Sequence, residues 1–205
     1  MESAGAPPLD ALPQLTAAWL TAALRHAGAL GEGEAVAAVG GEPFAVGVAM
    51  LSDLARLAPS YEPPAAAERD GVPSSMVVKF AASTEAKEIT EAYGGYQQEV
   101  RFYRELAPRL GEAVRVGPCV YTAMNPAEQR YTLLFDDLAT HPTLTPGDQV
   151  AGCTVAQATG AARAYARLHA AFWQAPALSA PPTAEGSLGW VVEPTDPRWS
   201  GIVSP

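Results

Sequence analysis

The spacing of apolar and polar positions predicts a helix near the start of the chain, followed by a segment with conflicting signals. Apolar residues repeat every fourth position over 15–27, with Thr16 as a suitable N-cap and Gly28 as a C-cap. The Pro-rich residues 1–14 predict a frayed terminus. Over 35–61, glycines interrupt apolar stretches as in a hairpin, yet the second half has helical spacing, so periodicity alone leaves both structures open.

A buried strand is predicted at Met76–Phe80, which is apolar and rich in β-branched residues except for Lys79. A helix is expected over Tyr96–Leu110, with Glu99 among its apolar side chains. Two strands joined by a turn are expected next, over Val116–Ala123 and Arg130–Phe135.

Helices are predicted again towards the end of the chain. The first begins in Thr145–Asp148, with Pro146 at its first position, and the second follows a capping box made by Thr154 and Gln157. This second helix is expected to end near Trp173, itself a core residue. Residues 174–205 carry no clear pattern. The inward face of the helix that follows Thr154 is predicted to hold Ala158, Ala162, Tyr165, His169 and Phe172, with His169 as a structural histidine.

Composition narrows the class of protein. The 205 residues are 48% hydrophobic, and no apolar run reaches the length of about 18 residues that a membrane helix needs. The first residues have no basic start typical of a secretory signal, so a cytoplasmic protein is expected. A net charge of −9 with 13 scattered Lys and Arg argues against nucleic acid as a partner. Cys119 and Cys153 lack metal-ligand spacing and are expected to be small buried residues.

Lys79 is the residue that most needs a chemical explanation. A cation in the middle of a buried strand is unfavourable unless an anion lies beside it. Glu99, a carboxylate on the apolar face of the next predicted helix, is the natural partner. A strand lysine paired to a helix glutamate holds nucleotide phosphates in kinases. Taken alone, Lys79 would more simply reach solvent from the strand edge, and Glu99 would lie on a solvated side of its helix.

Six short motifs then support a family resemblance that covers nearly the whole chain. In this order, they resemble aminoglycoside phosphotransferase and choline kinase-like proteins, and most closely the ecdysteroid kinase-like branch. The motifs are Pro43–Ala49, Ser75–Phe80, Glu99–Tyr103, Leu134–Leu138, Gly147–Gln149 and Leu168–Trp173.

The resemblance implies an ATP site. It makes 35–61 the first hairpin, with Gly47 in the loop over the phosphates and Ala49 where the family usually has a second glycine. Lys79 would contact the α- and β-phosphates while Glu99 holds it in place. The segment Phe135–Leu138 would be the hinge between lobes, whose backbone reads the adenine edge.

The acidic pair of that hinge has two open interpretations. Asp136 or Asp137 lies in the nucleotide site, or it caps the turn that follows. The resemblance implies that the nucleotide-binding residues are Gly47, Ala49, Lys79, Glu99, Phe135, Asp136 and Leu138.

The same comparison locates no catalytic loop. Transfer in these families uses a His-Gly-Asp-x-x-x-x-Asn loop and a further metal-binding aspartate. The three histidines, His26, His141 and His169, are followed by Ala, Pro and Ala. We therefore expect a chain that stops before this loop, and magnesium only in a complete protein.

The resulting expectation is an α+β, protein kinase-like fold. Residues 1–138 would form an antiparallel-sheet, nucleotide-binding N-lobe with one main helix, and 139–205 the start of an incomplete helical C-lobe. The expected activity is ATP-dependent phosphorylation of a small-molecule hydroxyl. The alternative is a non-catalytic nucleotide-binding or protein-interaction module with the same fold, so enzyme activity of this chain stays open.

Overall fold

The computed structural model describes residues 5–44, 51–81, 87–88, 90, 92, 94–111, 113–145, 147–148, 150–191 and 197. The chain divides into two compact units, and each is described by itself. The first comprises residues 1–100 and 117–140, and the second comprises residues 101–116 and 141–205.

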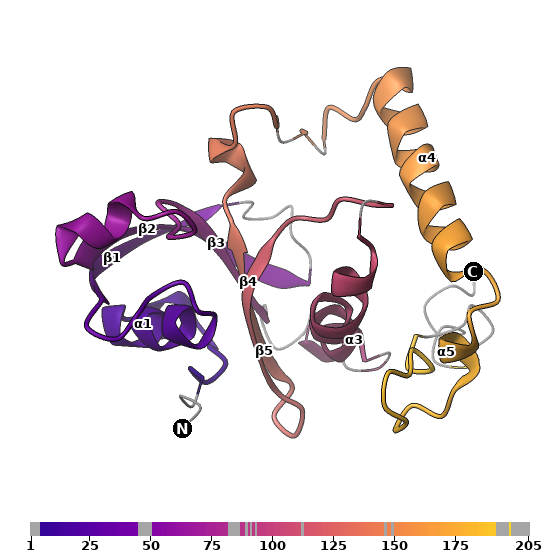
Figure 1. Ribbon diagram of the computed structural model, residues 1–205, viewed down its shortest axis with the longest axis horizontal. Coiled ribbons are helices and arrows are strands. Elements are labelled where there is room, and N and C mark those ends of the chain that lie inside the picture. The colour runs from indigo at the N-terminus through magenta and orange to yellow at the C-terminus, as the bar shows by residue number, and fades with distance from the viewer. Residues whose placement is uncertain are drawn as a thin grey trace. The chain divides into compact units, whose positions relative to one another are not determined.

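The first unit is built on a five-stranded sheet in which neighbouring strands are antiparallel (Figure 1). The strand order is β1-β2-β3-β5-β4, so β3 lies in the centre. The hairpin formed by the first two strands confirms the hairpin interpretation of 35–61 and excludes the helical one. The strands are β1 Ala35–Phe44, β2 Ser52–Glu62, β3 Met76–Ala81, β4 Cys119–Asn125 and β5 Arg130–Asp136.

One face of this sheet carries the main hydrophobic core. Met76, Val78 and Phe80 alternate along β3 and pack into this core with residues of helix α1, Ala17–His26. Thr16 caps α1 as predicted, because its hydroxyl accepts a hydrogen bond from the Trp19 amide at 3.1 Å. The expected α+β class is therefore confirmed in this unit.

The N-terminal segment is ordered against the sheet, which corrects the expectation that residues 1–14 are frayed. Over the described part, residues 5–14, Ala6 and Leu9 are buried in the core. The Leu9 amide donates a 2.7 Å hydrogen bond to Oγ1 of the buried Thr132 on β5. Composition predicted fraying, but this long-range contact fixes the segment.

The opposite face of the sheet receives helix α3, Gly95–Arg101. The ring of Tyr96 stacks on Tyr131 of β5, with centroids 4.4 Å apart, and Val100 is buried. The predicted single helix to Leu110 therefore exists, but it changes geometry along its length. It continues as a π-helical turn, Phe102–Leu106, and a 3-10 turn, Ala107–Arg109.

The second unit contains α4, Val155–Phe172, and α5, Pro176–Ser179. The predicted capping box of Thr154 and Gln157 is present at the start of α4. A small core forms around Leu106, Leu110 and Leu188.

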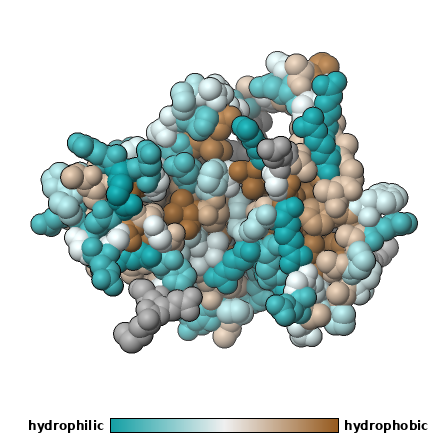
Figure 2. All heavy atoms as spheres, viewed as in Figure 1, coloured by the Kyte–Doolittle hydropathy of each residue, from teal (hydrophilic) through white to brown (hydrophobic). Residues whose placement is uncertain are grey.

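The predicted inward face of α4 is wrong for every residue but Phe172. No residue of this helix is buried, His169 is exposed, and Tyr165 and the C-cap residue Trp173 are 65% and 74% exposed. Figure 2 shows hydrophilic and hydrophobic side chains together along the visible side of α4. Phe172 of the predicted face packs against the small core, together with Leu168, which was not part of that face. Helical spacing defines a face without showing what covers it.

The predicted helix start at Thr145–Asp148 is also not borne out in the described residues. Asp148 instead closes a turn: its Oδ1 accepts hydrogen bonds from the amides of Val150 and Ala151, at 2.8 and 3.1 Å. The Gly152 amide bonds to the Asp148 carbonyl, and α4 begins only after it. The remaining 3-10 turns are Leu12–Gln14, Pro64–Glu68 and Leu138–Thr140.

Replacing Thr132 with Val tests the anchoring of the N-terminal segment. The substitution keeps the side-chain shape but leaves the buried Leu9 amide without its acceptor. We expect the free energy of unfolding to fall by about 1–3 kcal/mol, measured by urea denaturation. Thr183→Val at an exposed position is the control. Equal stability of both variants would show that the contact contributes nothing.

Candidate functional site

Lys79 and Glu99 form an ion pair on the α3 side of the sheet. Lys79 Nζ lies 2.6 Å from Glu99 Oε1, and the two side chains are 22% and 29% exposed. Both predicted partners are thus brought together, from the central strand and from the helix beside it. Because the pair is only partly buried, it adds little to stability, and its main effect is to hold the ammonium group in one place.

Helix α3 also holds the end of the hairpin. The Tyr96 hydroxyl donates a 2.8 Å hydrogen bond to the carbonyl of Leu51, just before β2. The hydroxyl of Tyr131 donates to Ser52 Oγ at 2.9 Å. The predicted phosphate loop leads into this point, but Gly47 and Ala49 lie outside the described residues.

Strand register defines the surface around Lys79. Side chains directly opposite each other on paired strands lie on the same face. Leu54 and Leu133 are therefore the lateral neighbours of Lys79. The adjacent row on this face consists of Arg56, Val77 and Phe135.

Asp137 is the most constrained polar residue near the predicted hinge. Its side chain is 3% exposed, and Oδ2 accepts hydrogen bonds from Arg56 Nε at 2.7 Å and Ser75 Oγ at 2.8 Å. Oδ1 accepts a 3.0 Å bond from the Ala139 amide, so Asp137 caps the turn Leu138–Thr140. This confirms the capping interpretation for Asp137.

The ionisation of Asp137 reflects these opposing influences. Burial raises the pKa of this carboxyl, but hydrogen bonds from Ser75, the Ala139 amide and Arg56 together outweigh it. The pKa consequently lies below its ordinary value, and the group is charged at neutral pH.

The other hinge residues differ in orientation. Phe135 shares the Lys79 face, whereas Asp136 is opposite Met76, whose side chain belongs to the core on the other face. The amides of Asp136 and Asp137 donate to the carbonyls of Pro118 and Ser75, at 3.1 and 3.3 Å. Both amides are therefore already used within the fold.

Sequence reasoning missed Arg56 and Ser75. A usable signal was present for Arg56, since it is a lone cation in an otherwise apolar stretch of β2, as Lys79 is in β3. Ser75 gave none, because a serine before a strand is common in any turn.

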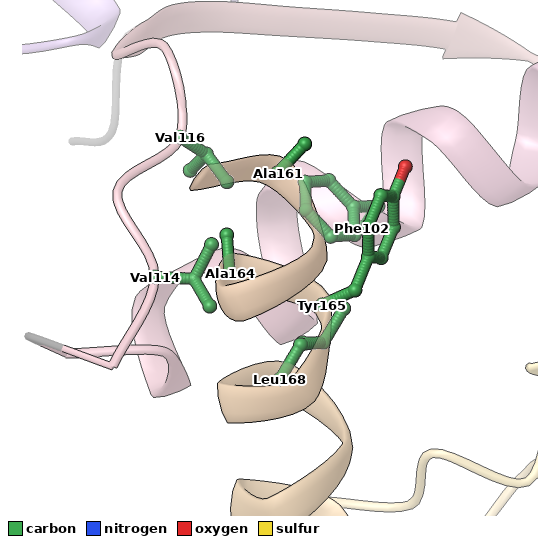
Figure 3. Close-up of a pocket in the computed structure, with 7 residues that line it drawn as sticks. All are labelled: Phe102, Val114, Val116, Ala161, Ala164, Tyr165 and Leu168. Carbon is green, nitrogen blue, oxygen red and sulfur yellow. The ribbon is translucent and has the colours of Figure 1, made fainter. Parts of the chain in front are cut away.

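A separate pocket lies in the second unit, with a volume of about 410 Å³. Figure 3 shows that its walls come from α4 on one side and from Phe102 and two valines on the other. It has no charged side chain, which makes it unsuited to a phosphate group. Its lining residues are Phe102, Val114, Val116, Ala161, Ala164, Tyr165 and Leu168.

Among the described residues, no group of three or more His, Cys, Asp or Glu side chains could hold a metal ion. Asn125 donates its side-chain amide to Glu128 in the turn after β4. Of the helices in the described parts, none is long and apolar enough to cross a membrane.

Cys119 is half-buried and Cys153 exposed, so the expectation that both are buried is wrong.

Comparison with known families now identifies the fold's relatives. The model of the ecdysteroid kinase-like family matches residues 47–176, more than half of the chain. The chain belongs to the ecdysteroid kinase-like family. This family is part of the aminoglycoside phosphotransferase and choline kinase-like superfamily, so the predicted resemblance is confirmed. Parallel searches of curated proteins and of solved structures returned no match.

Acidification tests the charge of Asp137. Because its pKa is lower in the folded than in the unfolded chain, it stabilises the fold above the unfolded value, about 3.9, and this contribution is lost as pH falls through the folded value. We expect the stability difference between wild type and Asp137→Asn to shrink as pH is lowered from 6 to 3. Urea denaturation at each pH measures it. A pH-independent difference would contradict the ionised state.

Proposed function

We propose that this member of the ecdysteroid kinase-like family uses its five-stranded sheet to bind ATP, for phosphorylation of a small-molecule hydroxyl. The observation that carries the proposal is the Lys79–Glu99 ion pair. A lysine held by a helix glutamate on the central strand provides a fixed cation for phosphate oxygens. The family match to residues 47–176 includes both partners and supports the same conclusion.

The nucleotide would lie along the face that carries Lys79. Its α- and β-phosphates would contact this ammonium group, beneath the loop that includes Gly47 and Ala49. Its adenine would lie near Phe135, two strand positions from the row of Lys79. Backbone groups of the Phe135–Leu138 segment other than the amides of Asp136 and Asp137 would read the adenine edge. Asp136 would take part through its backbone alone.

Residues 1–138 would then serve as the nucleotide-binding lobe and 139–205 as the beginning of the helical lobe. Transfer would join the acceptor oxygen to the γ-phosphorus and break the bond to the bridging oxygen, so that ADP leaves and a base takes the hydroxyl proton. No residue of this chain is assigned as that base or as a magnesium ligand. The acceptor class stays open among antibiotic, amino alcohol and sterol-like hydroxyls.

A non-catalytic nucleotide-binding or interaction module is the second candidate. One observation favours it: none of the three histidines opens a His-Gly-Asp sequence. Asn125, the only asparagine, is engaged by Glu128 in a β-turn of the first unit. Both candidates share the nucleotide site, and they differ in turnover alone. In either case we propose that the protein works in the cytoplasm.

Replacing Lys79 with Met tests the shared nucleotide site. We expect ATP binding to weaken about 10- to 100-fold, because a hydrogen bond to a charged group contributes about 1.5–3 kcal/mol. Isothermal titration calorimetry with and without magnesium measures the affinity. Arg25→Met, on helix α1 across the sheet, removes a positive charge without changing this face and is the control. Equal ATP affinity of wild type and Lys79→Met would exclude the proposed site.

Turnover separates the two candidates. With a panel of hydroxylated acceptors, we expect ADP release in a coupled assay if this chain carries a complete transfer site. ATP binding that depends on Lys79, without ADP release above that of Lys79→Met, supports the non-catalytic module. Phosphorylation of an acceptor by this chain would exclude the module.

A further inference from the structure

The Asp137 carboxylate joins three parts of the first unit. It receives donors from Arg56 on β2, from Ser75 at the start of β3, and from the Ala139 amide in the turn that follows. Arg56 and Ser75 lie 81 and 62 positions away from Asp137 along the chain. A single buried group therefore connects the residue that follows β5 with β2 and with the start of β3.

Arg56 extends this connection to the outermost strand on that side. Its guanidinium carbon lies 5.2 Å from the centre of the Phe44 ring, which is a cation–π distance. Phe44 is the last described residue of β1 before residues 45–50, the predicted phosphate loop. Arg56 also shares a row with Val77 and Phe135 on the Lys79 face. Through Arg56, Asp137 is thus connected to Phe44 at the end of β1.

We propose that Asp137 and Arg56 are positioning residues for the adenosine part of the nucleotide, and that they act by fixing the Phe135–Leu138 segment against β2 and β3. This inference rests on the proposed nucleotide site and deepens it. Asp137 does not contact the nucleotide, because its oxygens are taken by Arg56, Ser75 and the Ala139 amide.

Lys79 and Asp137 would act on different parts of the nucleotide, because they are held by different elements. Lys79 is held by Glu99 of α3 and acts on phosphates, whereas Asp137 is held by β2 and β3 and acts where the base lies. Without Asp137, the backbone of Phe135–Leu138 is no longer held against β2 and β3. A smaller fraction of molecules then has this segment in the conformation that binds adenosine. Loss of Lys79 leaves that fraction unchanged.

The experiment compares ATP and adenosine as probes by calorimetry. We expect Asp137→Asn to weaken both probes by the same factor, about tenfold. Lys79→Met should weaken ATP while leaving adenosine unchanged. Arg56→Lys is a milder second variant, since it keeps the charge and loses the planar group over Phe44, and it should weaken both probes as well.

Arg69→Lys is the matched control. Arg69 bonds to Glu34 at 2.6 Å, and its side chain is 46% exposed, as is that of Arg56, but it lies away from the hinge. It should leave both affinities unchanged. Circular dichroism confirms that each variant is folded before titration.

The outcomes are distinguishable. If folded Asp137→Asn and Arg56→Lys bind adenosine as wild type does, while Lys79→Met loses ATP affinity, the positioning role is overturned and the nucleotide site stands. If wild type binds neither probe, the proposed function itself fails, and the positioning role fails with it. A lower melting temperature with unchanged affinities would assign Asp137 to stability alone.

Discussion

The central strand β3 packs against an apolar core on one face and carries a charged side chain on the other, and the arrangement of the first unit depends on both contacts. Alternate residues, Met76, Val78 and Phe80, are buried against the α1 side. The residue between the last two, Lys79, faces the other way and needs an anion there. Helix α3 supplies Glu99, and its position is fixed further by Tyr96, which stacks on Tyr131 and bonds to the Leu51 carbonyl. The stacking and the hydrogen bond of Tyr96 thus hold α3 against this face, where Glu99 meets Lys79.

Features with local causes were predictable from the sequence. The caps at Thr16 and Thr154 depend on residues within one helical turn, and both are present. The partner of Lys79 was predictable because a charge in an apolar strand requires compensation and the next helix offered one carboxylate on its apolar face. The hairpin over 35–61 needed the family resemblance, since apolar spacing there fits a helix and a strand equally.

Features with distant causes were not predictable. The contact of Leu9 with Thr132 spans 123 positions, and that of Arg56 with Asp137 spans 81. Neither residue pair has a pattern that selects one partner among many. The prediction of the inward face of α4 failed for a related reason. Tyr165 and His169 have the right spacing for a common face, but whether a face is covered depends on residues elsewhere in the chain, here Phe102 and Val116.

The two polar anchors of the first unit also differ in how water reaches them, and this bears on their roles. Lys79 and Glu99 are 22% and 29% exposed, so a ligand can reach the ammonium group while Glu99 holds it. Asp137 is 3% exposed and has three donors, so releasing any one of them leaves a buried polar group unpaired. The first arrangement suits a cation, Lys79, that must engage a ligand's negative charge. The second suits a group that must not move when the ligand arrives.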